Sequence, residues 1–287
     1  MSENRERCDV GLKKQQGIQS VKFEEPPIIC AAASVVGQKE GDGPFGDVFD
    51  QIESDPKVGG DTWEDAEGRL QERAAELAIQ KAGCGKEAIR YIVAGDLLGQ
   101  LMASSFGLAG FDKPLFGVYG ACSTMGESIG IGSMLVEGGF ADYVLAMTSS
   151  HFASAEKQFR FPLGYANQRP KASTWTVTGS GAVVICKGDQ KPGMAKITGI
   201  TTGKIVDYGV KDTMNMGACM APAAASVVAA HFKDFGTDPS EYDQIITGDL
   251  GMVGKDILID ILRSEGYDIA DRYIDCGIEI YGRDAQA

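Results

Sequence analysis

The chain combines a large apolar content with a strong excess of acids. Its 287 residues are 44% hydrophobic and 23% charged, and 40 Asp and Glu against 27 Lys and Arg give a net charge of −13. This composition excludes a disordered or fibrous protein, and the negative charge disfavours nucleic acids and anionic lipid surfaces as partners. The length predicts one large α/β unit or two similar units that share a core.

The N-terminus and the cysteines indicate a reducing compartment. Residues 1–16 are charged and contain no apolar stretch, so we expect no signal peptide. The longest apolar runs, residues 26–36 and 221–230, are shorter than the about 20 residues that a membrane-spanning helix needs. The seven cysteines lie far apart and show no zinc-binding spacing. We therefore expect a cytosolic protein with reduced thiols that meets a membrane only through another protein.

Apolar patterning predicts alternating strands and helices after a loose arm at residues 1–17. A segment rich in Gly and acids, residues 37–61, predicts a long loop outside the core. The expected strands are 18–23, 28–36, 91–95, 115–119, 143–148 and a pair within 173–187. The expected helices are 63–81, 97–108, 124–137 and 217–234. This alternation is typical of a mostly parallel sheet with helical crossovers.

A weak internal repeat underlies the pattern. The segments KAGCGKEAIRYIVAGDL, which ends at Leu97, and DFGTDPSEYDQIITGDL, which ends at Leu250, align without a gap at an offset of 153 residues. Each contains a helix end, a turn, a buried strand and a Gly-Asp-Leu corner, so a duplicated α/β half is the economical explanation. The offset places the end of the second copy near residue 340, about fifty residues beyond Ala287, and predicts an incomplete second half with an uncovered sheet edge.

The stretch GVYGACSTMGES, residues 117–128, places Cys122 where a strand ends and a helix begins. Thr124 and Glu127 fit a capping box, which predicts that the helix begins directly after the cysteine. A helix N-terminus lowers the pKa of a thiol and presents N–H groups to an anion. Cys122 is therefore either a nucleophile or a buried, unreactive side chain, and the local sequence leaves both open.

A cysteine nucleophile for acyl transfer needs a base, and the chain has two histidines. His231 lies near a predicted helix C-terminus, where a surface or dipole role is the simpler interpretation. His151 follows the strand YVLAMTSS at the edge where α/β sheets gather ligands, so it is the one credible imidazole partner for Cys122. A capping or hydrogen-bonding role for His151 stays open.

A basic, aromatic segment follows at residues 155–173. It is either a solvated loop or a mouth for a planar anion, because guanidinium groups pair with carboxylates and stack on rings. Its cations are Lys157, Arg160, Arg169 and Lys171, and its interleaved aromatic residues are Phe159, Phe161 and Tyr165.

The two Gly-Asp-Leu corners place Asp96 and Asp249 directly after buried strands. A helix N-cap is the more frequent role for such an aspartate. Asp249 has an alternative: across the pseudo-twofold of the repeat it could face Cys122 and bind a proton or a metal ion. No loop with calcium-binding spacing is present, so the sequence leaves any metal site unknown.

These motifs together resemble the thiolase and ketoacyl synthase superfamily and, within it, the stage V sporulation protein AD family. The runs that carry the resemblance are DTWEDAE, GDLLGQ, FGVYGACSTMGES, TSSHFASAEKQFRFP, TWTVTGSGA and ITGDLGMVGKD. The resemblance extends from about Ser34 to Tyr281. It implies an α/β, thiolase-like fold of two pseudo-repeated halves in αβαβα layers, with residues 1–187 as the first half and 188–287 as the second, incomplete half.

The resemblance also implies a function. Proteins of this family bind dipicolinic acid (pyridine-2,6-dicarboxylate), free or as the calcium chelate, and assist its movement into the developing spore. Cys122 matches the nucleophile of condensing enzymes, and Asp249 falls where they place a histidine. Because that histidine is absent, we expect no catalytic residue and no resident cofactor, with calcium entering only together with dipicolinate. The expected ligand-binding residues are Cys122, His151, Lys157, Arg160, Arg169 and Asp249.

Other expectations rest on the resemblance as well. They are a homodimer, other stage V sporulation membrane proteins as partners, and a peripheral location on the cytoplasmic face of the forespore inner membrane. Two alternatives stay open: a Cys-dependent acyltransferase or condensing enzyme, and a purely structural subunit of a membrane channel assembly.

Overall fold

A seven-stranded sheet forms the centre of the first half. The structure is a computed structural model that describes residues 14–159, 162–165, 172–188 and 193–282. The strands are β3 (Ile28–Gly37), β4 (Gln51–Glu53), β5 (Ile89–Gly95), β6 (Leu115–Gly117), β7 (Tyr143–Ser150), β8 (Gly179–Cys186) and β9 (Ala195–Lys196). They are ordered β4-β3-β8-β7-β5-β6, and β9 pairs with β3.

The sheet is mixed rather than mostly parallel. Strands β6, β5 and β7 are parallel, as the predicted crossovers require, and β4 runs parallel to β3. Strand β8 is antiparallel to both β3 and β7, so the connection between β7 and β8, residues 151–178, is not a parallel crossover although it contains a helix. The predicted strand pair within 173–187 is therefore one strand, and residues 172–178 form no strand.

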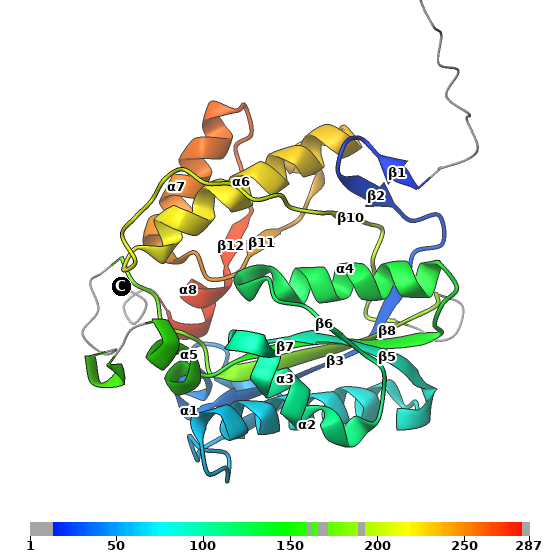
Figure 1. Ribbon diagram of the computed structural model, residues 1–287. Helices are drawn as coiled ribbons and strands as arrows, with labels where there is room; N and C mark the ends of the chain where they lie inside the picture. The colour runs from blue at the N-terminus through cyan, green and yellow to red at the C-terminus, as the bar shows by residue number, and fades with distance from the viewer. Residues whose placement is uncertain (1–13, 160–161, 166–171, 189–192, 283–287) are drawn as a thin grey trace, which may run out of the picture.

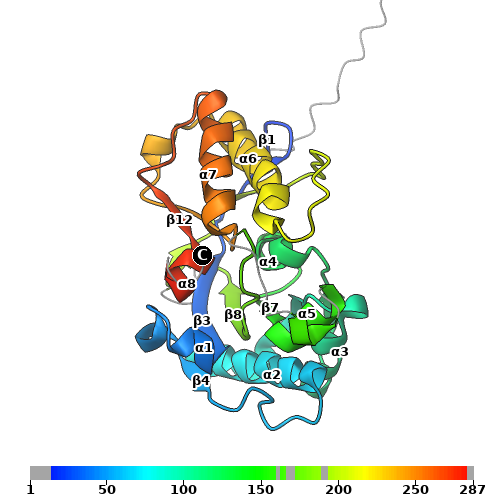
Figure 2. The ribbon, with the colours of Figure 1, turned by 90° about the vertical axis from the view of Figure 1, so that its left-hand side faces the viewer.

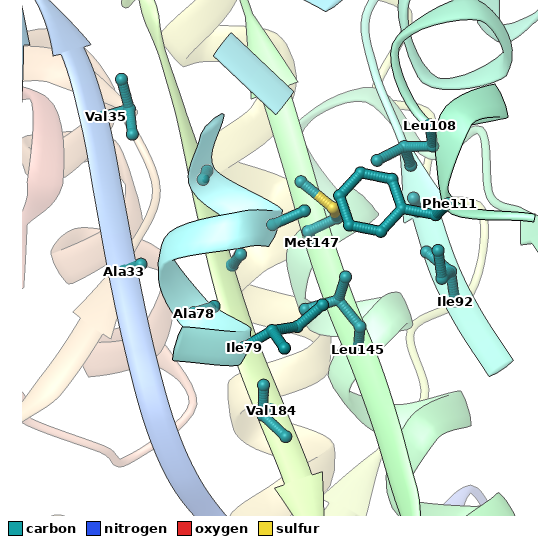
Figure 3. Packing of buried hydrophobic residues seen from close by; sticks show 14 of the residues in the cluster. Ala33, Val35, Ala78, Ile79, Ile92, Leu108, Phe111, Leu145, Met147 and Val184 are labelled. Atoms are coloured by element: carbon teal, nitrogen blue, oxygen red, sulfur yellow. The ribbon is translucent and has the colours of Figure 1, made fainter. Parts of the chain in front are cut away.

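Helices cover both faces of this sheet. Helix α2 (Trp63–Ala82) and α3 (Met102–Gly107) lie on one face and α4 (Thr124–Glu137) lies on the other (Figure 1). Small side chains such as Ala78 let α2 approach closely, and Ile79 packs over Leu145 and Val184 (Figure 3). Gly83 ends α2 with a φ of 59°, as the sequence predicts.

The second half repeats the order of helices and strands found in the first half. Its helices are α6 (Met216–Phe235), α7 (Gly251–Ser264) and α8 (Cys276–Tyr281), and its strands are β11 (Ile245–Thr247) and β12 (Tyr273–Asp275). Strands β5 and β6 pair in parallel with Ile92 opposite Leu115, and β11 and β12 do the same with Ile245 opposite Tyr273. Ile92 and Ile245 are separated by the 153 residues of the predicted repeat.

The two halves stack in five layers (Figure 1). From the outer helices α2 and α3 the order is sheet, α4, the pair β11 and β12, and finally α6 and α7. The predicted αβαβα arrangement is confirmed. Within the described residues the second sheet has two strands, whereas the first has seven.

Smaller elements join the halves. Strands β1 (Gln15–Gln16), β2 (Ser20–Lys22) and β10 (Gly199–Thr201) form a three-stranded sheet that lies against α6. Helix α5 (Phe152–Phe159) follows β7, and α1 (Gln38–Gly41) follows β3. The segment predicted as a loop outside the core instead contributes α1, the edge strand β4 and the buried side chain of Glu40.

The predicted division at residue 187 stays a prediction. Strand β9 lies beyond that position and still pairs with β3 of the first sheet.

Candidate functional site

Cys122 lies in the turn between β6 and α4. A 3-10 turn, Ala121–Ser123, precedes the helix, and Ala121 has a φ of 50°, which is uncommon for a residue with a Cβ. The helix begins at Thr124, as predicted. The turn leaves Cys122 exposed to solvent as a free thiol.

The predicted capping box is wrong. The hydroxyl of Thr124 accepts a hydrogen bond of 3.3 Å from the amide of Gly120, and the carboxylate of Glu127 is hydrogen-bonded to the hydroxyl of Ser123. The helix has no side-chain cap on its first amides. The extra turn before α4 moves Thr124 from the cap position into the helix, so the two side chains bond to the turn instead.

The predicted effect of the helix N-terminus on the Cys122 thiol is also wrong. Although the residue is exposed, nearby protein atoms displace much of the water around its sulfur. This desolvation raises the pKa of Cys122 above its ordinary value of 9.0. The negative charge of Asp249 raises the pKa further, and Cys219 adds a smaller contribution. A hydrogen bond from the backbone opposes the shift without reversing it. At neutral pH the group is therefore a thiol, not a thiolate.

Side chains from the second half approach Cys122. Asp249 follows β11, Cys219 lies in the first turn of α6, and Cys276 begins α8. The charge of Asp249 raises the pKa of Cys276 as well, after burial and Asp275. Asp249 therefore acts on two thiols, Cys122 before α4 and Cys276 at the start of α8, and the described groups that act on Cys122 from the second half are Asp249 and Cys219.

Cys219 and Cys276 escape the sequence reasoning. The repeat could have indicated Cys276, because it follows β12 as the Cys122 turn follows the equivalent strand β6. The sequence around Cys219 does not indicate a functional residue, since the Ala-rich start of a helix is not typical of a binding site.

Asp249 is not the cap of α7, so that prediction is wrong. Asp275 takes this role from the end of β12: its Oδ2 accepts hydrogen bonds from the amides of Leu250, at 2.8 Å, and Gly251, at 3.2 Å. Asp249 remains beside Cys122, which agrees with the alternative in which it faces the thiol across the pseudo-twofold.

Asp96 does cap a helix, at longer range than expected. Its Oδ1 accepts from the amide of Leu98 at 2.8 Å, and its Oδ2 accepts from the amide of Ser104 at 2.7 Å, in the first turn of α3. Gln100 and Leu101 have positive φ values between these contacts. The predicted helix at 97–108 is consequently shortened to α3.

His151 is held by backbone groups. Its Nε2 lies 2.8 Å from the carbonyl oxygen of Pro56, and its Nδ1 accepts from the amide of Ala153 at 3.1 Å. The ring is buried and packs against Trp63, with the centroids 5.5 Å apart. Burial lowers the pKa of His151, and both ring nitrogens are engaged. The geometry therefore gives Cys122 no imidazole base from this residue.

Lys157 lies on α5 and forms an ion pair with Glu64 at the start of α2. Burial opposes ionisation of Glu64, but the Lys157 side chain holds the pKa of Glu64 below its ordinary value. The charge of Lys157 is thus largely balanced within the protein. Arg160 and Arg169 lie outside the described residues.

His231 has a structural role on α6. Its ring nitrogens lie 2.8 Å from the hydroxyl groups of Thr201 and Tyr242, and its ring packs 4.6 Å from that of Phe235. It joins β10 to the second half.

Two absences concern only the described part of the chain. No group of three or more His, Cys, Asp or Glu side chains there is arranged to hold a metal ion. Nor does any helix there combine the length and apolar character needed to cross a bilayer.

Comparisons with known proteins agree with this geometry. The family model of Stage V sporulation protein AD (SpoVAD) matches residues 17–287. Stage V sporulation protein AD of Bacillus subtilis (strain 168) is 44% identical over 273 residues, which cover 95% of this chain and 80% of that protein.

Solved structures of condensing enzymes share the fold. Cerulenin-bound OleA of Xanthomonas campestris superposes with a TM-score of 0.59 at 16% identity, covering 90% of this chain and 84% of that one. The 3-oxoacyl-(acyl carrier protein) synthase III of Pseudomonas aeruginosa superposes with a TM-score of 0.57 at 15% identity, with the same coverage of 90% and 84%. At this identity the likeness shows the fold alone. The match over almost the whole chain shows more: the chain belongs to the Stage V sporulation protein AD family, on a thiolase-like fold.

Proposed function

We propose that this sporulation protein binds pyridine-2,6-dicarboxylate at the site around Cys122 without chemical conversion, and thereby assists its uptake into the developing spore. The observation that carries the proposal is the carboxylate of Asp249, which lies close enough to the Cys122 thiol to raise its pKa. A nucleophilic cysteine needs a base and a lowered pKa, whereas here desolvation by the surrounding protein atoms and the like charge of Asp249 raise the pKa of Cys122. Both histidines of the chain are engaged elsewhere.

The same carboxylate favours the calcium chelate over the free ligand. Pyridine-2,6-dicarboxylate is a dianion at neutral pH, and Asp249 repels a second negative charge near Cys122. A chelated calcium ion carries positive charge and accepts further oxygen ligands, which a carboxylate supplies. Asp249 would then contact the metal of the chelate, and the N-terminus of α4, whose first amides have no side-chain cap, would face a ligand carboxylate.

Calorimetry tests both statements. When the protein is titrated with calcium and pyridine-2,6-dicarboxylate together, we expect tighter binding than with the dicarboxylate alone. Asp249→Asn should weaken binding of the chelate by about tenfold, or about 1.4 kcal/mol. The control Asp243→Asn changes an exposed carboxylate and should leave the affinity unchanged. Benzene-1,3-dicarboxylate, which lacks the chelating ring nitrogen, should gain nothing from calcium. A folded protein that gives no heat with either form of the ligand contradicts the proposal.

A second candidate is a Cys-dependent acyltransferase, which the position of Cys122 before α4 and the fold of the condensing enzymes favour. Intact mass after incubation with acyl thioesters distinguishes the two functions. An adduct that disappears in Cys122→Ala, together with repeated turnover, supports the enzyme. The binding proposal expects no turnover.

The edge of the first sheet supports a homodimer. Strand β6 ends the sheet, and its three residues are exposed. Large apolar side chains gather around it: Phe106 is 77% exposed, Tyr119 is 59% exposed and Phe116 is 45% exposed. An unpaired edge with apolar neighbours invites pairing with a second copy. In analytical ultracentrifugation Phe116→Lys should convert the dimer to a monomer; a wild-type monomer at all concentrations contradicts the dimer.

Membership of a sporulation family supports a place beside other stage V sporulation membrane proteins, on the cytoplasmic face of the forespore inner membrane. In this proposal the protein transfers its bound ligand to an assembly of membrane proteins. Fractionation of sporulating cells tests the location: release from membranes when the partner proteins are absent supports it, and an unchanged soluble pool contradicts it. Partner capture without any affinity for the ligand would instead support a purely structural subunit.

A further inference from the structure

The two most exposed large apolar side chains of the described residues lie at one end of the molecule. Ile205, which follows β10, is 99% exposed, and Ile18, in the turn between β1 and β2, is 88% exposed. A groove of about 530 Å³ beside α6 brings the two segments together, since Ile18, Lys204, Val206 and Tyr208 all line it. Exposed apolar side chains that gather in this way mark a contact surface.

The turn that carries Ile18 is held firmly. The carboxylate of Asp234, near the end of α6, accepts from the amides of Ile18 and Gln19, each at 3.0 Å, and from the hydroxyl of Ser20 at 2.8 Å. Gly17 has a φ of 59°, and a Cβ there would lie 2.1 Å from Oδ1 of Asp234, so the turn requires glycine. The projection of Ile18 into solvent is therefore a property of the fold and not of a loose end.

Residues 202–215, which we call the strap, run from β10 to the start of α6 along the side of that helix (Figure 1). The amide of Thr202 donates to the hairpin of β1 and β2 at 3.1 Å, and the carbonyl of Met214 accepts from a serine hydroxyl at 2.6 Å. Among the described residues, no hydrogen bond joins residues 203–211 to another element. The strap is thus fixed at both ends, and its middle presents Ile205 and Tyr208, which is 66% exposed.

The charge of this end differs from that of the whole chain. Residues 14–23 and 195–236, which contain the hairpin, the strap and α6, include six lysines, three aspartates and no glutamate or arginine, whereas the net charge of the chain is −13. Every other described lysine side chain has an ion pair, a hydrogen bond or a ring contact. The described lysine side chains that have none of these within the described residues all lie here: Lys22, Lys196, Lys204, Lys211 and Lys233.

The acids at this end do not cancel the lysines. Asp234 is occupied by the hairpin turn, and Asp207 and Asp212 accept from the amides of their own turns, at 2.6 Å and 2.9 Å. Glu265, after α7, also lines the groove. The lysines still outnumber these acids, so this end is attracted to an anionic surface that repels the rest of the chain. The net charge alone argues against contact with lipid, but its distribution permits contact here.

We propose that this end of the molecule docks on an anionic phospholipid surface. Ile18, Ile205 and Tyr208 enter the boundary between headgroups and acyl chains, and the lysines lie beside lipid phosphates. Tyrosine suits this boundary because its ring is apolar and its hydroxyl is polar. Three inserted side chains give a weak, reversible contact, so a stable location still needs the membrane proteins proposed as partners.

The composition of this end favours lipid over a protein partner. Lysine is depleted from the cores of protein interfaces, whereas lysines beside apolar side chains are typical of proteins that lie on a membrane surface. Here Lys204 and Lys233 line the same groove as Ile18 and Tyr208. The apolar side chains also stand on two separate segments with lysines between them, which a fluid headgroup layer accommodates more readily than a rigid partner does.

The strap connects this end to the site around Cys122. It ends at Asn215, whose side chain accepts from the amide of Ala218 at 3.1 Å and caps α6. Cys219 lies in the turn of α6 that follows the cap. Docking therefore places one wall of the proposed ligand site on a segment that contacts the membrane. This consequence rests on the proposed function, whereas the docking itself does not.

Sedimentation of the whole chain with lipid vesicles, in the absence of ligand, tests the apolar part of the contact. At low salt we expect the protein to bind vesicles of phosphatidylcholine mixed with phosphatidylglycerol, and to bind phosphatidylcholine alone much more weakly. Ile205→Ser should weaken binding by about tenfold, because an apolar side chain no longer leaves water. The matched control Val48→Ser changes a side chain that is 70% exposed before β4 and should leave binding unchanged.

Two lysine variants test the charged part of the contact. Lys204→Gln and Lys233→Gln should each weaken binding to the anionic vesicles by about fivefold, and neither should change binding to phosphatidylcholine alone. Lys57→Gln, an exposed lysine in the loop after β4, is the control and should bind as the wild type does. Equal losses in all three variants would show that only the net charge matters and would overturn the proposal.

A tryptophan at the tip of the strap reports insertion directly. The emission of Ile205→Trp should shift to shorter wavelengths with anionic vesicles and should be quenched by brominated lipid, whereas Val48→Trp should show neither effect. No binding of the wild type to anionic vesicles, or equal binding of Ile205→Ser and wild type, overturns the proposal. Loss of Ile205→Ser from spore membranes without any binding to vesicles would assign this end to a protein partner and also overturn it. Calorimetry that shows no ligand binding would remove the proposed function and leave the docking in place.

Discussion

The hydroxyl of Tyr281 donates a hydrogen bond of 2.5 Å to the carboxylate of Glu40, across 241 residues of the chain. Both side chains are buried. Beside them the backbone of Gly43 packs so closely on α8 that a Cβ at this position would lie 1.9 Å from the carbonyl oxygen of Ile280. These contacts fix α8 of the second half against α1 of the first, where the two helices lie near β3 in Figure 2.

Tyr281→Phe should therefore destabilise the protein. It removes a donor from Glu40, whose Oε2 is already without a hydrogen-bond partner, and such a loss costs about 1–3 kcal/mol. Urea unfolding measures this change. The matched control Tyr119→Phe affects an exposed ring and should leave the free energy of unfolding unchanged. Equal stability of wild type and Tyr281→Phe would show that the bond contributes nothing.

Asp275→Ala should destabilise the second half more than a surface substitution does. The carboxylate of Asp275 is 2% exposed and accepts from the amides of Leu250, Gly251 and Ile278, at the starts of α7 and α8. Loss of one cap costs about 1 kcal/mol, so we expect about 2 kcal/mol or more here. Thermal unfolding with Asp256→Ala, an exposed position on α7, as the control checks this value.

Cys122 should react slowly with iodoacetamide at neutral pH, because its pKa lies above the ordinary 9.0. Asp249→Asn removes the like charge and should lower the pKa, so alkylation at a given pH becomes faster. Peptide mass spectrometry over a pH series gives the rate at this sulfur alone, and Asp243→Asn is the control. An unchanged or slower rate in Asp249→Asn would mean that the carboxylate does not act on the thiol.

Glu67 makes stability depend on pH in a direction opposite to that of a paired acid. Below its ordinary pKa of 4.5 the group is protonated in both states, and between 4.5 and about 7 only the unfolded chain loses the proton. Stability should therefore fall over this range, by about 3 kcal/mol in total, and stay constant above it. Relative to the wild type, Glu67→Gln should become progressively more stable as the pH rises. Parallel stability curves for the two proteins would contradict the raised pKa.

Local patterns predicted the regular elements well. The helix at 124–137 begins and ends at the predicted residues, and α2 and α6 differ from prediction by one residue at the ends. The repeat was visible because each half must bury the same strand and close it with the same corner. These features depend on neighbours in sequence, which a pattern contains.

Features that depend on distant residues were missed. Nothing near Asp275 says that it caps α7, because the cap is formed only when β12 lies beside β11. The engagement of His151 depends on Pro56, 95 residues away, and the raised pKa of Cys122 depends on the second half. Strand β4 was hidden in a Gly-rich segment, since a short edge strand has too few residues for a clear alternation.

The site around Cys122 is built from both halves, and this affects the thermal stability expected of the protein. Cys122 comes from the first half, whereas Asp249 and Cys219, which act on its pKa, come from the second, so the proposed ligand site needs both halves. A molecule bound between them acts only on the folded, joined state and adds about 2.7 kcal/mol when its free concentration is a hundred times its Kd. If the protein binds pyridine-2,6-dicarboxylate as proposed, its thermal stability will therefore rise with the concentration of that ligand.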